Sequence, residues 1–340
     1  MSSPSAPSSS PQPAGVVAPR RCVLVIGIDG CRPDCLTITH APTLTSLMTP
    51  VTSEEKTKTA FSLKSQVGDI GWSGPNWTSA CTGVWRDKHG VSGNTFPTQQ
   101  FDKYPSIFQR LKSFDSSAVT ASCVNWKPLN DNILRPSDHP FTHEDDDDSV
   151  VASARRLLDS EERLDILFVH LDDVDAAGHA FDYGPTVPEY VEALKKTDDR
   201  ISSILSSLRH RQSRYSSEVE DWLVVITTDH GGMDYTHEDG RPENRTNFLI
   251  LHGSDVAPGE IFPSPVIADV APTVLAHLGV KISSAWHLDG RPVGLKLTRR
   301  GHFMDLTKSQ DPFNMFPIPK EELDAEGYAQ HPTTGIAETN

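Results

Sequence analysis

The segment CVLVIGIDG (22–30) decides the fold class of this chain. Its first seven residues are apolar or glycine and do not alternate with polar residues, which is typical of a strand covered on both faces of a parallel sheet. The runs DILFVHL (165–171) and WLVVITT (222–228) have the same character, and helical patterns occupy 187–210 and 267–280. Strands that alternate with helices predict an α/β protein, here a three-layer αβα sandwich around a mostly parallel sheet.

The two ends of the chain differ in composition from the region between them. Residues 1–20 are rich in Ser and Pro and are predicted to be a disordered tail. Residues 305–340 are polar with scattered Phe and Pro, and are predicted to be a C-terminal extension. The region 21–304 is long enough to bury a core and is predicted to form one domain.

The net charge and the cysteines of the chain indicate which partners and which cellular compartment to expect. The net charge of -15 predicts repulsion of duplex nucleic acid. We expect no membrane span and no signal peptide, because the sequence has neither an apolar run of about 18 residues nor a basic segment followed by an apolar one. The five Cys lack zinc-site spacing, and reduced thiols in a cytoplasmic protein are the simplest interpretation, although Cys31 and Cys35 could form a bridge. The acidic run HEDDDD (143–148) is predicted to be a solvated loop rather than a cation site, and the oligomeric state is left open.

Acidic and histidine residues follow each of the three apolar runs directly. The carboxyl ends of strands in an open parallel sheet border the ligand crevice, so the three runs direct these side chains to one place. A single Asp after a strand is commonly a turn residue, but three clusters, two of them with His, favour a functional site. The residues are Asp29, then Asp172, Asp173, Asp175 and His179, and finally Asp229 and His230.

Carboxylates and imidazoles together are ligands for zinc, iron or manganese. Asp175 and His179 are four residues apart, so one helical turn would direct both to one metal. Asp229 and His230 are adjacent, and their side chains are expected to diverge toward two metals or a bridged pair. Two metals about 4 Å apart form a clamp for displacement at phosphorus.

The segment GWSGPNWTSA (71–80) supplies hydroxyls for such a displacement. Pro75 is favoured in a first helical turn, which predicts a helix over 76–84. Ser73 would then precede the helix, where N–H groups and the dipole stabilise a phosphate. Thr78 lies inside the helix, where a hydroxyl commonly bonds back to a carbonyl, so position favours Ser73 as the nucleophile. The alternative is that Ser73 is an ordinary N-cap residue.

These residues resemble the nucleotide pyrophosphatase/phosphodiesterase (type I phosphodiesterase) family of the alkaline phosphatase superfamily, over roughly residues 21–300. In that family the first strand ends in a metal-binding Asp, matched by Asp29. The nucleophile lies in a T-x-P-N stretch, matched by SGPN (73–76), followed by T-G at 82–83 and H-G-x-x-x-N at 89–94. The resemblance implies an alkaline-phosphatase-like catalytic domain over 21–304, in which Ser73 attacks phosphorus. It also implies that the Asn94 amide binds a phosphate oxygen beside the N–H of Ser73.

The resemblance also assigns the ligands of two divalent metal ions, with Zn²⁺ expected. The D-x-x-G-H motif is matched by residues 175–179, and T-[ST]-D-H-G by residues 227–231. The last histidine of the family follows this second motif, and His237 matches it better than His252 or His287 because it precedes the apolar run FLIL. One metal would bind Asp175, His179 and His237; the other would bind Asp29, Ser73, Asp229 and His230.

The implied activity is hydrolysis of a small phosphate ester through a phospho-serine intermediate. The chain departs from the family in having Ser where Thr is usual, which is chemically conservative. Trp72, Gly74 and Trp77 also differ from the usual residues and are predicted to shape the substrate pocket, whereas Trp126 is either a core or a pocket residue.

A phosphomonoesterase and a phosphonate hydrolase of the same superfamily remain alternatives, as does a catalytically inactive metal-binding protein. A sulfatase is disfavoured, because its [CS]-x-P-x-R pattern would need Arg at Trp77.

Overall fold

The computed structural model describes residues 18–49, 58–160, 162–214 and 220–296. The predicted extension 305–340 and residues 1–17 of the predicted tail lie outside these ranges. One sheet of eight strands, in the order β4-β3-β5-β1-β6-β7-β2-β8, is formed by the described residues. The strands are β1 (Arg20–Ile28), β2 (Thr59–Gln66), β3 (Thr120–Val124), β4 (His139–Thr142), β5 (Ile166–Leu171), β6 (Glu220–Thr227), β7 (Thr246–His252) and β8 (Gly259–Glu260).

The three apolar runs form adjacent parallel strands in the middle of the sheet. Strand β1 pairs with β5 on one side, with Val23 opposite Ile166, and with β6 on the other, with Val23 opposite Leu223. Strand β7 is antiparallel to both of its neighbours, β6 and β2, whereas the other pairs are parallel. The predicted mostly parallel sheet is therefore confirmed.

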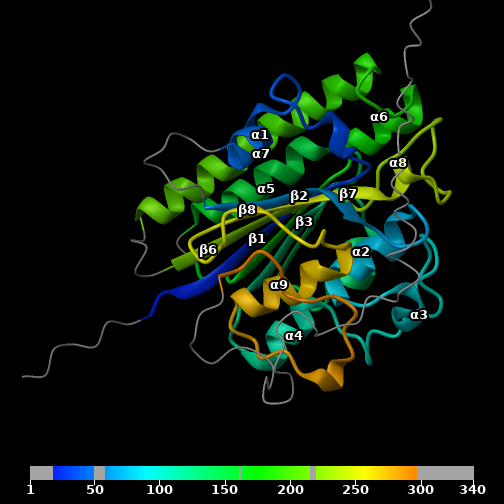
Figure 1. Cartoon of the computed structure of the whole chain (residues 1–340). Coiled ribbons are helices and arrows are strands. Elements are labelled where there is room, and N and C mark those ends of the chain that lie inside the picture. Colours follow the sequence, from blue (N-terminus) through cyan, green and yellow to red (C-terminus); the bar gives the residue numbers. More distant parts are fainter. Residues whose placement is uncertain (1–17, 50–57, 161, 215–219, 297–340) are drawn as a thin grey trace, which may run out of the picture. The chain divides into compact units, whose positions relative to one another are not determined.

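Helices cover both faces of the sheet, as Figure 1 shows, with α1, α5 and α7 on one face and α2, α4 and α9 on the other. Alternate residues of β1 enter the two cores: Leu24 and Ile26 face the first group, and Val23 and Val25 face the second. The αβα sandwich is thus produced by a strand that is buried on both faces. The helices are α1 (Pro42–Met48), α2 (Ser73–Thr82), α3 (Arg86–His89), α4 (Ile107–Phe114), α5 (Asp147–Asp159), α6 (Asp173–Phe181), α7 (Pro188–Arg214), α8 (Pro242–Arg245) and α9 (Val270–His277).

Two predicted helices differ from the observed ones at their starts. The helix expected over 76–84 begins three residues earlier, at Ser73, since Pro75 occupies a first-turn position that needs no N–H donor. The helix expected over 267–280 begins as a 3₁₀ turn at Ile267–Asp269 and continues as α9. Among the described helices, none has the length and apolar character needed to cross a membrane.

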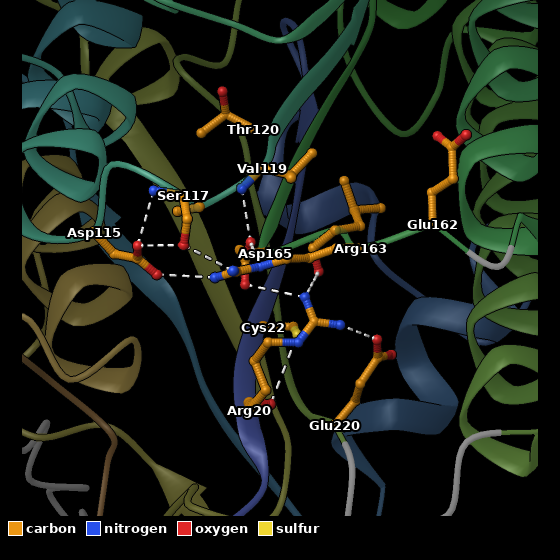
Figure 2. A network of polar contacts seen from close by, with 12 residues as sticks. Arg20, Cys22, Asp115, Ser117, Val119, Thr120, Glu162, Arg163, Asp165 and Glu220 are labelled. Atoms are coloured by element: carbon orange, nitrogen blue, oxygen red, sulfur yellow. Dashed lines mark hydrogen bonds and ion pairs between the residues drawn. The ribbon is translucent and has the colours of Figure 1, made fainter.

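The amino ends of the three central strands are joined by ion pairs around two buried carboxylates, those of Asp165 and Glu220 (Figure 2). Arg20 lies at the start of β1, and its Nη1 is 3.1 Å from Asp165 Oδ1. Arg20 also contacts Glu220 at the start of β6. Arg163 binds Asp165 through Nε at 2.7 Å and Asp115 through Nη2 at 2.9 Å. This network connects the starts of β1, β5 and β6, at the edge of the sheet opposite to the carboxyl ends of these strands.

The acidic run 143–148 is not entirely a solvated loop. Asp147 is 1% exposed, and its carboxylate accepts hydrogen bonds from Asn125 Nδ2 at 2.9 Å and from the backbone N–H groups of Asp172 and Asp173 at 3.0 and 3.1 Å. The prediction was wrong at this position because Asp147 caps a helix distant in sequence, α6, which periodicity does not reveal. All five Cys are free and buried, so Cys31 and Cys35 form no bridge.

Candidate functional site

The carboxyl ends of β5, β1 and β6 converge, as the sequence predicts. Asp29 directly follows β1, and helix α6 with Asp175 and His179 follows β5. Asp229 and His230 follow β6, where the chain leaves the sheet. Since neighbouring parallel strands end at the same edge, side chains from three segments that are 50 to 201 positions apart in sequence meet at one place.

The first group of possible metal ligands contains Asp29, Asp229 and His230. His230 Nε2 lies 3.2 Å from Asp29 Oδ1 and 3.3 Å from Asp229 Oδ2. The hydroxyl of Ser73 lies 3.3 Å from the same nitrogen. Asp229 and His230 thus converge rather than diverge, because they follow the end of β6 and strand alternation no longer applies to them.

The second group contains Asp175, His179 and His237. His179 Nε2 lies 3.3 Å from Asp175 Oδ2 and 3.1 Å from His237 Nε2. The ring of His237 also stacks on that of His230, with 3.7 Å between centroids and an interplanar angle of 12°. The two groups therefore form one continuous cluster.

Backbone carbonyls fix the tautomer of all three imidazoles. The Nδ1 atom of His179 contacts the carbonyl of Tyr235 at 3.1 Å, that of His230 contacts Gly231 at 2.7 Å, and that of His237 contacts Gly71 at 2.6 Å. A carbonyl only accepts, so each Nδ1 carries the proton. In its neutral form, each ring directs an Nε2 lone pair into the cluster, which is the arrangement of a metal-ligating histidine.

These lone pairs fit a cation. When His179 and His237 are both neutral, their unprotonated Nε2 atoms lie 3.1 Å apart and repel each other unless a positive charge lies near both. In the first group, Asp29 Oδ1 and Asp229 Oδ2 are buried and receive no hydrogen bond within the described residues. Unpartnered buried oxygens beside an imidazole lone pair are a donor set suited to zinc.

The pKa values in the cluster are shifted because these side chains are buried close to one another. Burial, and then the negative charge of Asp29, raise the pKa of Asp229 well above its ordinary range. Burial and the adjacent His230 lower the pKa of His237 to about 4. Although burial opposes it, the nearby carboxylates raise the pKa of His230 to about 10. A bound divalent cation would neutralise the carboxylates and remove the need for a proton on His230.

Among the hydroxyls of the 71–80 segment, that of Ser73 lies at the cluster. It is the first residue of α2, and the preceding Trp72 occupies the N-cap position without a side-chain capping bond, so Ser73 is not an N-cap. Thr78 Oγ1 donates to the carbonyl of Gly74 at 2.6 Å, and Ser79 Oγ contacts His89 Nε2 at 3.1 Å. Both of these hydroxyls thus have structural partners outside the cluster, that of Thr78 within α2 and that of Ser79 in α3.

The side chain of Asn94 is held at the start of α2. Its Oδ1 accepts the N–H of Gly74, the residue after Ser73, at 2.8 Å, and the side chain of this exposed residue keeps Nδ2 as a donor. Of the three candidate histidines, only His237 lies in the cluster. His252 Nδ1 contacts Thr59 Oγ1 at 2.9 Å, and the exposed His287 accepts a bond from Lys88 at its carbonyl.

The tryptophans do not share one role. Trp77 is fully buried and donates from Nε1 to Asp29 Oδ2 at 3.0 Å, so the prediction that it shapes the substrate pocket was wrong. The ring of Trp126 is partly buried against the core beside Phe96, with 6.3 Å between centroids.

Two residues near the cluster were missed by sequence reasoning. His170 is a polar residue within the apolar run 165–171, and that interruption was an available signal. Tyr183 had no comparable signal.

The comparison with protein families agrees with this geometry. The profile of the type I phosphodiesterase / nucleotide pyrophosphatase family matches residues 23–252. The chain belongs to this family. Members handle phosphoesters and depend on metal ions.

Relatives with known names match smaller parts of the chain. GPI ethanolamine phosphate transferase 1 of Neurospora crassa is 32% identical over 127 residues, which are 36% of this chain and 11% of that protein. The matched region thus spans about a tenth of the transferase.

Solved structures share the fold at low identity. Murine ectonucleotide pyrophosphatase/phosphodiesterase 5 has a TM-score of 0.57 and 12% identity, with 76% of this chain and 95% of that chain covered. A 2-O GAG sulfatase has a TM-score of 0.62 and 13% identity, with 80% and 73% covered. The expected alkaline-phosphatase-like αβα fold is thereby confirmed.

Proposed function

We propose that this protein is a two-metal phosphodiesterase of the nucleotide pyrophosphatase type, with Ser73 as its nucleophile. The observation that carries the proposal is the convergence of three imidazole Nε2 atoms and two unpartnered carboxylate oxygens in one cluster, with the Ser73 hydroxyl 3.3 Å from His230 Nε2. Asp175, His179 and His237 would hold one divalent ion. Asp29, Asp229 and His230, with Ser73, would hold the other, and Zn²⁺ suits both donor sets.

Bound ions would supply Lewis-acid stabilisation of the charge that develops on the oxygens. The hydroxyl of Ser73 attacks phosphorus, the P–O bond to the leaving alcohol breaks, and the phosphoryl group remains on Ser73. Water then attacks the phospho-serine, the P–Oγ bond breaks, and the hydroxyl is restored. Asn94 Nδ2 and the N–H of Ser73, at the positive end of α2, would donate to a non-bridging oxygen in both steps.

Transfer of the phosphoryl-containing group to an alcohol is a second candidate, favoured by the match to GPI ethanolamine phosphate transferase 1. The first step is common to both reactions, and only the acceptor of the second step differs. Phosphomonoester and phosphonate hydrolysis use the same donor set and remain alternatives within the superfamily.

The test is hydrolysis of bis(p-nitrophenyl) phosphate by the zinc-loaded full chain and two matched variants. Ser73→Ala should lower kcat by at least about a thousandfold and leave most of the bound zinc, as measured by elemental analysis. Thr78→Ala should retain turnover, because its hydroxyl donates to the carbonyl of Gly74 within α2. Turnover that survives Ser73→Ala, or wild-type protein that binds no zinc, would overturn the proposal.

The substrate class is tested on the wild type with a nucleotide diester, a pyrophosphate, a monoester, a phosphonate and a sulfate ester. A diester or pyrophosphate should give the highest kcat/KM. An added alcohol that becomes phosphorylated at the expense of hydrolysis would identify the transferase reaction instead.

A further inference from the structure

The carboxylate of Asp29 has two differently used oxygens. Its Oδ2 lies 3.0 Å from Trp77 Nε1 and 2.9 Å from His170 Nε2, and both partner side chains are fully buried. His170 Nδ1 lies 3.5 Å from the N–H of Trp126, which leaves Nε2 as the protonated nitrogen. The other oxygen, Oδ1, faces His230 and receives no hydrogen bond within the described residues.

The carboxylate of Asp175 is held in the same manner. The hydroxyl of Tyr183 donates to Asp175 Oδ1 at 2.7 Å, and Tyr183 is 4% exposed. The second oxygen, Oδ2, faces His179 Nε2 at 3.3 Å. Each of the two metal groups therefore contains a carboxylate with one oxygen bound by a buried donor and one directed at the imidazoles.

Glycines provide the space for both donor rings. A Cβ atom at Gly27 of β1 would lie 2.3 Å from Trp77 Cη2, and one at Gly178 of α6 would lie 2.1 Å from Tyr183 Cε1. A Cβ at Gly232 would lie 2.4 Å from the same tyrosine ring. Backbone contact on these faces leaves each ring little freedom to rotate, so the donor atoms are fixed in position.

From these contacts we infer that Trp77 with His170, and Tyr183, are positioning residues that orient Asp29 and Asp175, respectively, toward the two metal ions. The inference rests on the proposed function. A ligand whose second oxygen is already bound loses less freedom when it coordinates a metal, and such outer partners typically contribute a factor of about 10 to 100 in metal affinity.

The inference is tested by zinc titration of full-length variants in two backgrounds. In His237→Ala, which removes a ligand of the Asp175 group, the remaining tight site is the Asp29 group. In Asp229→Ala the remaining site is the Asp175 group. We expect Trp77→Phe to weaken zinc binding about 10- to 100-fold in the first background and to leave the second unchanged. Tyr183→Phe should have the opposite pattern.

Trp222→Phe is the matched control. It also removes an indole donor to a buried carboxylate, since Trp222 Nε1 donates to Glu220 Oε2 at 2.8 Å, but at the amino ends of the strands. It should change zinc affinity in neither background. Cobalt substitution adds a spectroscopic readout: the d–d absorption should change only for the site whose carboxylate has lost its donor.

A second pair addresses Asp29 if Trp77→Phe does not fold. His170→Ala should weaken the Asp29 site, and His170→Gln, which retains an N–H donor, should recover part of the affinity. Two intact sites in the wild type, together with unchanged affinity in both Trp77→Phe and Tyr183→Phe, would overturn this inference alone. Fewer than two sites in the wild type would overturn the proposed function as well.

Discussion

At the residue scale, this site depends on which atom of each side chain is already engaged. The three imidazoles of the cluster donate from Nδ1 to backbone carbonyls, and Asn94 uses its oxygen for the N–H of Gly74. These local bonds leave Nε2 atoms and one amide N–H directed at the space beside Ser73. Residue types alone indicate a metal and phosphate site, but the engaged atoms determine which groups face the substrate.

The amide of Asn94 provides the first prediction. Asn94→Asp preserves the oxygen that accepts the N–H of Gly74 and removes the Nδ2 donor. If Nδ2 stabilises the transition state, kcat/KM for the diester should fall about 10²- to 10³-fold while the far-UV spectrum and zinc content stay unchanged. Steady-state kinetics of the two proteins measures the effect. A variant with wild-type kinetics would remove Asn94 from the proposed site.

The choice among the histidines provides the second prediction. His237→Ala should lose one of two bound zinc ions, because His237 Nε2 lies 3.1 Å from His179 Nε2 in the Asp175 group. His252→Ala is the control, since His252 bonds Thr59 outside the cluster and should keep both ions. Elemental analysis after dialysis gives the zinc content. Equal zinc in the two variants would contradict the assignment of His237.

At the element scale, helix α6 carries two of the proposed ligands and depends on a residue of α5. Asp147 accepts the N–H groups of Asp172 and Asp173 at the start of α6, and Arg200 of α7 contacts Asp147 and Asp173 at 3.5 and 2.6 Å. The acidic run therefore connects α5, α6 and α7. These contacts hold the start of α6, the helix that carries Asp175 and His179.

The third prediction concerns this cap. Asp147→Ala leaves buried N–H groups without an acceptor and should lower the free energy of unfolding by about 2–3 kcal/mol, with weaker zinc binding at the Asp175 group. Asp146→Ala is the control: Asp146 is an exposed N-cap of α5, so its loss should cost about 1 kcal/mol and leave zinc affinity unchanged. Urea denaturation and zinc titration measure both effects. Equal losses in the two variants would argue against a special role of Asp147.

At the scale of the whole described domain, the two ends of the central strands differ in whether their charged side chains form ion pairs with arginines. The carboxyl ends gather carboxylates and imidazoles that lack a counter-charge. The amino ends are neutralised by ion pairs within the chain, where Glu220 contacts Arg20 (Figure 2). Glu220 also contacts Arg211 and accepts a hydrogen bond from Trp222. The proposed chemistry thus lies at one end of the sheet, and the ion pairs lie at the other.

The fourth prediction follows from this asymmetry. Although burial opposes it, hydrogen bonds from Arg211 and Trp222 hold the pKa of Glu220 below its ordinary value of 4.5. A lowered pKa in the folded state adds stability that is fully present above the ordinary value and is lost as the pH falls through the folded pKa. Glu220→Gln removes the carboxylate that the buried Arg211 and the partly exposed Arg20 contact, and should cost about 3 kcal/mol at pH 7.

The pH dependence is the decisive readout for Glu220. The difference in unfolding free energy between wild type and Glu220→Gln should shrink as the pH falls below 4.5, because the wild-type carboxylate becomes protonated. Urea denaturation at pH 7 and at pH 3 measures it. A difference independent of pH would mean that the amide change alters packing rather than charge pairing.

The sequence by itself determined the fold class and the residues that gather at the carboxyl edge of the sheet. Three apolar runs that end in Asp or His predict buried parallel strands, because a strand covered on both faces cannot alternate and its end must border a crevice. Those features are local, and so is the match of Ser73, Asp175–His179 and Asp229–His230 to family motifs.

Only the tertiary structure decided which atoms face one another. The convergence of Asp229 and His230, the helix cap by Asp147, and the donors Trp77, His170 and Tyr183 behind Asp29 and Asp175 depend on where distant segments pack. A hydrogen bond across 141 positions, such as that between His170 and Asp29, leaves no periodicity in the sequence. It forms because β1 and β5 are adjacent in the sheet, and that adjacency exists only in the folded chain.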